Sequence, residues 1–454
     1  MASNAQQNER RRKLLLVAYD FPPVTSAGML RVAGMTKYLL RKNWDVTVLT
    51  VKRSFVHTSE DSLELIPEGV RVVRTWSFEL RRLERWLVQR IEGRSDAETL
   101  TEFPDERLGR FGWRSWCSRM VRRVFALIIR ATAFPDPKAG WLLPLLFRSW
   151  RLMANERYDV VLSSSLPHSL QLAVLLLRKL RSFRWVTDFR DPWTIPERGT
   201  KRKWDRRIRR FVESKVLTRC DAVVTNTPGN YEALIEWLGD PIEKKALVIT
   251  NGFDTEVACD WTTSNRDQPG CDFVYTGEVY PGMLDTYVRA LRFMREQGTA
   301  RLPKLWVFGR VPGESILRGI SDSHLQGSIE FKGRIPFDES LRMIRDATAL
   351  LLLLPHAKGF ETCVPSKLYP YLFSPRPILA LAPRGDATRI VEKTGRGVAV
   401  ATEEPADVAE AIIDFLNAAR TGALNLKRND SELEKYRMEI LVDRMDDVLR
   451  KRVG

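Results

Sequence analysis

The chain has 454 residues, 44% of them hydrophobic, and this length suggests two or three domains with ordinary apolar cores. Five cysteines are scattered without a CxxC pair or a repeated spacing, which argues against a metal cage or a disulfide framework and favours a reducing cytoplasm. No segment holds about 18 uninterrupted apolar residues, and residues 14–18 are too few for the core of a signal peptide. We therefore expect a soluble or peripheral protein without a membrane span.

The formal net charge is +16, and it is unevenly distributed along the chain. Residues 1–250 hold 45 Lys and Arg against 28 Asp and Glu, whereas residues 251–454 hold 28 against 29. A positive first half attracts anionic surfaces such as phospholipid headgroups, pyrophosphate-linked lipids or nucleic acid. Because the sequence carries no recognisable DNA- or RNA-binding motif, nucleic-acid binding is only a remote alternative, and we expect no nucleic-acid partner.

The first half alternates strand and helix patterns. It begins with a strand at 13–19, a loop that contains Gly28, a helix from about 29 to 41 and a strand at 44–51, which together form a βαβ unit with parallel strands. Later strands are expected at 71–73, 158–163, 184–187, 222–225 and 246–250. This alternation predicts a doubly wound α/β domain.

A strongly basic segment from about 76 to 150 interrupts this alternation. Within it, residues 113–129 place Trp113, Trp116 and several aliphatic side chains at helical spacing among arginines, which indicates an amphipathic helix with interfacial aromatics. Two interpretations are open: the helix contacts an anionic membrane, or the segment packs on its own domain and its arginines form a solvated face. We favour membrane contact because the charge excess of the first half adds to the aromatic content.

The motif Asp-Phe-Arg-Asp-Pro-Trp, at residues 188–193, directly follows one of these strands. A guanidinium and carboxylates at the carboxyl end of a strand can orient hydroxyl groups and offset developing charge, which suits Arg190 with Asp188 and Asp191. The same Arg–Asp pairing can instead staple the loop. His168 is the other polar candidate, although a lone loop histidine is more often a hydrogen-bonded structural residue.

The alternation restarts after a linker at 254–270 that is rich in Asp, Thr, Ser and Asn. Strands are expected at 273–276, 304–308, 329–331, 350–354, 377–382 and 395–401, with helices at 284–297, 338–346, 405–418 and 431–450. The second half therefore predicts a second α/β domain.

One stretch of this half suggests a ligand site. The apolar run at 350–354, closed by Pro355, suits a central strand buried on both faces. A polar loop with Glu361 follows, and Pro365 and Ser366 mark the start of a helix before the next strand. In such a βαβ unit the ligand crevice lies outside the carboxyl ends of the strands, where helix amides favour a phosphate.

The segment VPSKLYPYLFSPRPILA, at 364–380, resembles the donor-site segment of retaining GT-B glycosyltransferases of family 4, and DFRDPW resembles one branch of that family. The loop FPPVTSAGMLR resembles the family's first loop, and residues 251–254 resemble its interdomain hinge. The resemblance implies two doubly wound, Rossmann-like α/β domains that face each other across a cleft. Residues 1–253, with the basic insertion, would bind the acceptor, 254–430 would bind the nucleotide sugar, and a helix at 431–454 would cross back to the first domain.

The chain departs from the family pattern at two places that bind the donor. Pro370 stands where relatives carry a glutamate for the ribose, and the loop after the strand at 273–276 lacks their arginine and lysine. Proline in the first helical turn costs little, but it cannot accept a hydrogen bond from a hydroxyl group. Glu361 is either a substitute acceptor or a solvated carboxylate, and Lys367 and Arg310 are the nearest compensating cations.

The resemblance implies roles for three groups of residues. The candidates for catalysis are Arg190, Asp191 and Asp188. The candidates for donor binding are Gly277, Glu278, Arg310, Glu361, Ser366, Lys367 and Leu368, and those for acceptor binding are Gly28, Arg31, His168 and Trp193. No Asp-x-Asp pair or histidine cluster stands at an expected strand end, so we expect no metal, and no cofactor besides the nucleotide sugar donor.

The expected activity is metal-independent transfer of a sugar from a nucleotide-diphosphate donor, with retention, to a saccharide that is lipid-linked or belongs to a cell-envelope polysaccharide or exopolysaccharide. The protein would act in the cytoplasm, peripherally on the inner face of the plasma membrane. A second class remains open: a degenerate GT-B protein that binds a partner without catalysing transfer, motivated by Pro370 and Met283 in place of donor-binding residues.

Overall fold

The computed structural model describes residues 11–24, 26–52, 60–78, 87, 90, 117, 120–121, 136–194, 203–257, 261, 271–321, 325 and 327–451. The predicted helix at 113–129 and most of the basic insertion lie outside these residues. Contacts between Cα atoms divide the chain into two compact units, one formed by Met1–Phe189, Arg207–Val223 and Arg452–Gly454, and the other by Arg190–Arg206 and Val224–Lys451.

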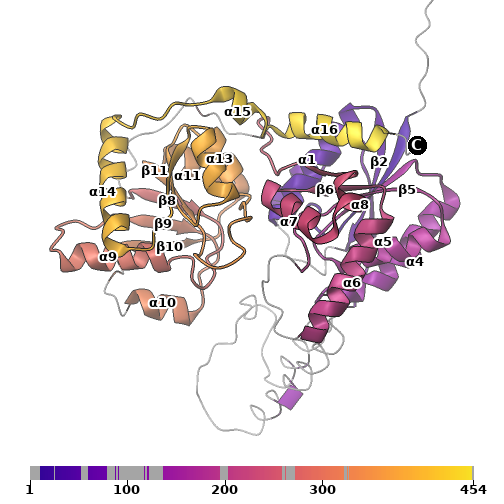
Figure 1. Cartoon of the computed structure of the whole chain (residues 1–454), viewed down its shortest axis with the longest axis horizontal. Coiled ribbons are helices and arrows are strands. Elements are labelled where there is room, and N and C mark those ends of the chain that lie inside the picture. Colours follow the sequence, from indigo (N-terminus) through magenta and orange to yellow (C-terminus); the bar gives the residue numbers. More distant parts are fainter. Residues whose placement is uncertain are drawn as a thin grey trace, which may run out of the picture. The chain divides into compact units, whose positions relative to one another are not determined.

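The first half of the chain forms a seven-stranded sheet in the order β3-β2-β1-β4-β5-β6-β7 (Figure 1). Its strands are β1 (Arg12–Ala18), β2 (Trp44–Val51), β3 (Arg71–Thr75), β4 (Val160–Ser164), β5 (Arg184–Asp188), β6 (Ala222–Thr225) and β7 (Ala246–Val248). β1 pairs in parallel with β2 and β4, so that Leu16 lies between Val48 and Leu162. The side chains from Leu14 to Ala18 are all buried, as is typical of a central parallel strand.

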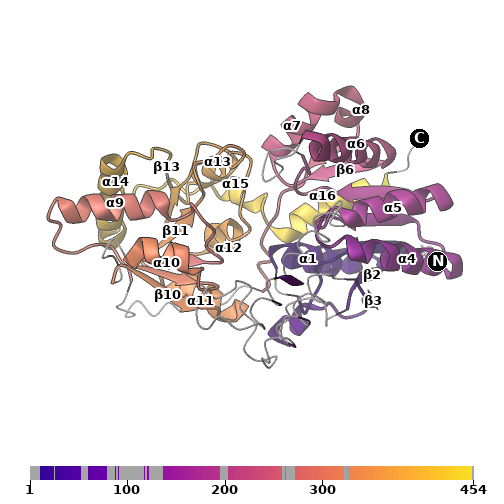
Figure 2. The same ribbon diagram turned by 90° about the horizontal axis from the view of Figure 1, so that it is seen from below.

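Helices flank this sheet (Figures 1 and 2): α1 (Ala27–Arg41), α4 (Leu142–Asn155), α5 (Ser169–Leu180), α6 (Lys203–Arg219), α7 (Pro228–Leu238) and the short α8 (Asp240–Glu243). Two of them begin at side-chain caps. The Ser26 hydroxyl accepts a hydrogen bond from the Met29 amide at α1, and the Thr227 hydroxyl accepts one from the Asn230 amide at α7. Each of these helices follows the carboxyl end of a strand, and each cap satisfies a helix amide that has no partner within the helix.

The second half forms a six-stranded sheet in the order β10-β9-β8-β11-β12-β13 (Figure 1). Its strands are β8 (Phe273–Thr276), β9 (Leu305–Phe308), β10 (Ile329–Gly333), β11 (Ala349–Leu353), β12 (Ile378–Leu381) and β13 (Gly397–Val400). All neighbouring pairs are parallel. All five residues of β11 are buried, which confirms the central strand predicted from its apolar run.

The helices of this half are α9 (Asp285–Glu296), α10 (Glu314–Ser321), α11 (Phe337–Asp346), α12 (Leu368–Phe373), α13 (Asp386–Lys393), α14 (Pro405–Thr421), α15 (Asp430–Glu434) and α16 (Met438–Arg450). The prediction of a single helix at 431–450 is wrong, because two helices, α15 and α16, occupy this range. The chain breaks between α15 and α16 because Arg437 is extended and forms an isolated parallel bridge with Phe253. Within the part of the chain that the structure describes, no helix is both long enough and apolar enough to cross a membrane.

Helices α4, α10 and α13 are among those that the sequence did not predict. Pro144 and the aromatic, basic composition hide α4, although proline is tolerated in a first helical turn. The other two have only eight residues each, so the apolar residues of one face recur too few times to reveal the helical period.

Candidate active site

The carboxyl edge of the second sheet brings together several of the predicted donor-binding residues. Gly277 follows β8 with a φ of +124°, a conformation that favours glycine, and its amide donates to the Phe308 carbonyl at 2.7 Å. A Cβ atom on Gly309 would overlap the Gly277 carbonyl. The ends of β8 and β9 therefore approach each other closely because both positions lack side chains.

Lys367 lies against this glycine pair. Its Nζ atom is 3.6 Å from the centroid of the Tyr275 ring, and a Cβ atom on Gly277 would come within 2.6 Å of it. Burial lowers the pKa of Lys367 from its ordinary value of 10.5 to about 7, although Glu278 partly opposes this shift. The ammonium group therefore sits in an apolar setting where an anionic ligand would be strongly favoured.

Two arginines complete a cationic cluster at the same edge. Arg334 forms an ion pair with Glu278, and Arg310 Nε lies 3.8 Å from the same carboxylate oxygen. Arg310 was predicted from the sequence, whereas Arg334 was not. The signal was present, because each arginine follows a glycine at the end of its strand, as Gly309-Arg310 after β9 and Gly333-Arg334 at the end of β10.

The loop before α12 holds Glu361 in a fixed conformation. One Glu361 carboxylate oxygen accepts a hydrogen bond from the Gly359 amide at 2.6 Å. The Glu361 carbonyl accepts from the Asp386 amide at 2.7 Å, and a Cβ atom on Gly385 would overlap that carbonyl. Glu361 is exposed, so its other carboxylate oxygen can accept a hydrogen bond from a ligand.

The start of α12 differs from the expectation. The helix begins at Leu368 rather than at Ser366, and the amides of Leu368 and Tyr369 already donate to the carbonyls of Pro365 and Ser366. These two amides are therefore less available to a phosphate, and cationic side chains carry more of the phosphate binding at this edge. Pro370 lies in the first turn, as expected.

Tyr371 joins α12 to the end of β8. Its hydroxyl oxygen accepts a hydrogen bond from the Thr276 amide at 2.8 Å. Burial raises the pKa of Tyr371 to about 12, so the phenol stays neutral. This contact fixes the turn that carries Lys367 relative to the strand that carries Gly277.

The carboxyl edge of the first sheet joins two residues that were predicted for different roles. Arg31, in α1, donates from Nε and Nη2 to the two carboxylate oxygens of Asp188 at 3.0 and 2.8 Å. Ser164, at the end of β4, donates to the same carboxylate at 2.7 Å. Both charged side chains are buried, with 3% and 0% of their surfaces exposed. The geometry therefore suits a positioning role for both residues.

The remaining candidates of the first half lie at the starts of α1 and α5 and in the DFRDPW loop. Gly28 is buried in the first turn of α1, and the His168 ring, at the start of α5, lies 5.5 Å from the Phe189 ring. Asp191 is exposed, and the Arg190 carbonyl accepts a hydrogen bond from the Asn230 side chain at 3.1 Å.

Trp193, the last of these candidates, is partly exposed two residues after Asp191. In the DFRDPW loop Asp191 is therefore exposed and Arg190 is half-buried, whereas Asp188 anchors the base of the loop.

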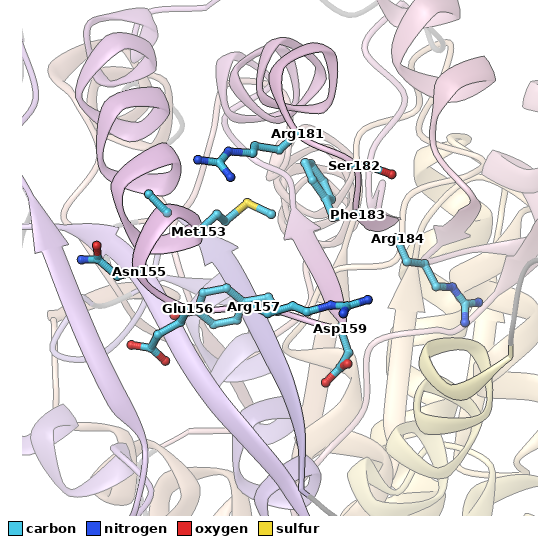
Figure 3. A pocket seen from close by; sticks show the side chains of 11 residues that line it. Met153, Asn155, Glu156, Arg157, Asp159, Arg181, Ser182, Phe183 and Arg184 are labelled. Atoms are coloured by element: carbon cyan, nitrogen blue, oxygen red, sulfur yellow. The ribbon is translucent and has the colours of Figure 1, made fainter.

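A pocket of about 530 Å³ lies at the opposite, amino-terminal edge of this sheet, before β4 and β5 (Figure 3). Its lining includes Glu156, Arg157, Asp159, Arg181 and Arg184. The helices α4 and α5 both end there, and the partial negative charge at the carboxyl end of a helix favours cationic side chains and disfavours a phosphate. This pocket therefore does not have the character of a phosphate site.

The structure shows no group of three or more His, Cys, Asp or Glu side chains with metal-binding geometry among the residues it describes.

Residues 28–252 match the family model of the glycosyl transferase 4-like domain. Among solved structures, the chain is similar to sucrose-phosphate synthase from Thermosynechococcus elongatus, with 14% identity, coverage of 97% of this chain and 98% of the other, and a TM-score of 0.65. It is also similar to Anabaena HepE in complex with UDP-glucose, with 13% identity, 96% and 99% coverage and a TM-score of 0.64.

The lipopolysaccharide outer core galactosyltransferase WaaB is a third similar structure, with 10% identity, 96% and 99% coverage and a TM-score of 0.54. No curated protein matches the sequence. The similar structures establish the fold, and the family model covers the half of the chain that carries the DFRDPW loop. Residues 28–252 therefore form a domain of the glycosyl transferase 4-like family, and the chain has the two-sheet fold of the GT-B glycosyltransferases.

Proposed function

We propose that the protein transfers a sugar from a nucleotide-diphosphate donor that binds at the carboxyl edge of the second sheet. The observation that carries this proposal is the position of the half-buried Lys367, whose ammonium group lies beside Gly277, with Arg310 and Arg334 on the neighbouring strand ends. A diphosphate is the ligand that such a cluster suits, because several cations can share its negative charge.

The donor would lie with its ribose at the loop before α12. There, Glu361 would accept the ribose hydrogen bonds that relatives give to a glutamate at the position of Pro370, and Ser366 and Leu368 would line the turn. Anabaena HepE, which has the same fold, was solved with UDP-glucose. This supports a uridine diphosphate sugar as the first donor to test.

The acceptor would bind to the first half of the chain, near Gly28, His168 and Trp193. We propose a lipid-linked saccharide or a growing cell-envelope polysaccharide or exopolysaccharide, used at the cytoplasmic face of the plasma membrane. Two observations support this class of acceptor: the charge excess of residues 1–250, and the similarity in fold to a lipopolysaccharide galactosyltransferase.

Transfer would retain the configuration of the donor sugar. Arg190 and Asp191, on the loop that follows β5, would orient sugar hydroxyl groups and stabilise charge in the transition state. Lys367, Arg310 and Arg334 would neutralise the leaving diphosphate, a task for which other enzymes use a divalent cation, so the proposed reaction needs no metal.

The experiment is to incubate the full-length protein with a panel of labelled nucleotide sugars and to measure both nucleotide binding by calorimetry and the release or transfer of the labelled sugar. Binding of a nucleotide diphosphate together with turnover of one donor supports the proposal. Failure to bind any nucleotide would instead favour a degenerate GT-B protein that serves as a binding partner.

A further inference from the structure

Five large apolar side chains, two just after β3 and three along α4, are exposed to solvent. We call them the aromatic surface: Trp76 (43% exposed), Phe78 (62%), Leu143 (68%), Phe147 (61%) and Trp150 (42%). Large apolar residues exposed together mark a contact surface in soluble proteins, whereas single exposed ones need no explanation.

The contacts between β3 and α4 make this surface continuous. The Trp76 and Phe78 rings, just after β3, are 4.0 Å apart and nearly perpendicular, and the Phe78 amide donates to the Gly140 carbonyl at 3.1 Å. A Cβ atom on Gly140 would overlap the Phe78 backbone, so the two segments touch. The helix α4 then begins two residues later, and it lies against β3 (Figure 2).

Along α4 the remaining three side chains recur at positions i, i+4 and i+7. Leu143, Phe147 and Trp150 therefore share one face of the helix, and the rings of Phe147 and Trp150 lie 6.4 Å apart. The opposite face, with Leu145 and Leu152, is buried. The exposed face is thus a second apolar face, which packing on the sheet does not require.

The charged side chains of α4 itself are positive, and Glu156, the residue after the helix, is paired with Lys13 and Arg71. Between residues 142 and 155, α4 carries Arg148 and Arg151 and no acidic residue. The acidic side chain nearest in sequence before α4, Asp136, is enclosed by hydrogen bonds from the Ser169 amide and hydroxyl group. Tryptophan and phenylalanine beside arginine suit the headgroup level of an anionic bilayer, where rings sit below the phosphates and guanidinium groups bind them.

The aromatic surface adjoins the edge at which the acceptor would react. Trp141, directly before α4, packs its ring at 5.2 Å from the Tyr19 ring after β1 and donates its indole N–H to the Thr75 hydroxyl at the end of β3 at 2.6 Å. A membrane that touched Trp76, Phe78 and the first turn of α4 would therefore lie next to the carboxyl ends of β1 and β3.

We propose that the aromatic surface inserts into the headgroup region of an anionic membrane and presents the lipid-linked acceptor to this edge of the sheet. The inference rests on the proposed function for the identity of the acceptor, but membrane attachment itself is independent of it. The partner is an anionic phospholipid bilayer, because the positive border would gain nothing from a neutral one.

The first experiment is flotation of the full-length protein with vesicles of phosphatidylcholine alone or with one-third phosphatidylglycerol. We expect flotation only with the anionic vesicles. The test variant is Phe147→Ser with Trp150→Ser, because both side chains are exposed and their loss should leave folding intact. Its affinity for anionic vesicles should fall on the order of tenfold.

The control is Ile413→Ser with Ile440→Ser, which removes two other exposed apolar side chains, 38% and 40% exposed, from the other compact unit. It should float like the unmodified protein. Arg148→Gln with Arg151→Gln should weaken flotation and remove its dependence on phosphatidylglycerol. Equal flotation of the test variant and the control would overturn the inference, as would the absence of flotation of the unmodified protein.

Nucleotide binding separates this inference from the proposed function. If the test variant keeps its affinity for the nucleotide but loses the vesicles, the aromatic surface is a membrane contact. If the unmodified protein binds anionic vesicles but no nucleotide, the proposed transferase function fails while the inferred surface stands. If the unmodified protein forms a dimer that the test variant does not form, and neither floats, a second copy covers the surface and the inference is wrong.

Discussion

Arg31 and Asp188 form a buried, two-point ion pair that ties α1 to the end of β5, across 157 residues of sequence. The pair stands at the base of the loop that carries Arg190 and Asp191. Its burial means that its charges are not free to bind a substrate. Its effect is to hold two strand-end loops at a fixed separation.

Breaking this pair should destabilise the protein strongly. Asp188→Asn should lower the free energy of unfolding by about 3 to 5 kcal/mol, because it leaves the Arg31 charge buried without its partner. Denaturant unfolding measures the change. The control is Asp338→Asn, which breaks the exposed pair with Arg342 on α11 and should cost at most about 1 kcal/mol. An Asp188→Asn protein that is fully stable but inactive would show that Asp188 acts in catalysis.

Lys367 should lower the stability of the folded protein at neutral pH, although it favours donor binding. Its pKa is about 7 in the folded protein and near the ordinary 10.5 in the unfolded chain, so between these values only the unfolded chain keeps the proton. Stability should therefore rise with pH across this window, and Lys367→Met should stabilise the protein at neutral pH by roughly 1 kcal/mol or more and flatten this dependence. Urea unfolding at neutral pH and at about pH 10 tests this sign.

The same Lys367→Met variant should lose affinity for a nucleotide diphosphate. In the unmodified protein this affinity should fall as the pH rises above 7, because the ammonium form binds the phosphates. Lys393→Met, which removes an exposed lysine from α13, should change neither property. A variant that is less stable and binds the nucleotide normally would contradict a role for Lys367 in the donor site.

Arg334 should bind the diphosphate of the donor. Arg334→Ala should weaken UDP binding by about 1 to 3 kcal/mol and leave uridine binding unchanged, because only the phosphates are contacted. Glu278→Gln should strengthen UDP binding, because in the unmodified protein the Glu278 carboxylate competes with the diphosphate for Arg334 and Arg310. Calorimetry measures both. Arg342→Ala serves as the control, and equal losses for UDP and uridine would argue for a structural role.

Glu361 should bind the ribose. Glu361→Ala should weaken UDP binding by about 1 to 3 kcal/mol, and removing the ribose hydroxyl groups from the nucleotide should cost the unmodified protein about as much. The Glu361→Ala variant should bind the nucleotide without ribose hydroxyl groups as strongly as it binds UDP. Glu392→Ala, an exposed carboxylate of α13, is the control. Independent, additive losses would identify Glu361 as a solvated loop residue.

Arg190 should matter for turnover rather than for folding. Arg190→Ala should lower kcat about 100-fold or more, since a positioned charge acts mainly on the transition state, and should leave the melting temperature unchanged. Donor turnover and thermal unfolding of the same preparation decide the question. Full activity with a lower melting temperature would show that Arg190 only staples its loop.

The strands were predictable because burial on both faces leaves a continuous apolar run, as in residues 350–354, of which all but Leu354 lie in β11. The position of Lys367 and Glu361 at the carboxyl edge of the second sheet was predictable because they stand in a recognisable segment, and their role in donor binding stays a prediction. The pairing of Arg31 with Asp188 was not, since it depends on β1, β4 and β5 being neighbours, and strand order is not written in local patterns. Arg334, like Arg310, follows a glycine at the end of its strand, but its ion pair with Glu278 was not predictable because it depends on the adjacency of β8, β9 and β10.

The break between α15 and α16 sets an order of events during synthesis. The Phe253 amide donates to the Tyr436 carbonyl, and the Met438 amide donates to the Phe253 carbonyl, both at 3.0 Å. At a translation rate of about 5 to 20 residues per second, Tyr436 and Met438 are therefore synthesised roughly 10 to 40 s after Phe253. Until then the backbone around Phe253 lacks these two hydrogen bonds. A nascent chain stalled before residue 436 should consequently be cut by proteases near Phe253, whereas the finished chain should resist cleavage there.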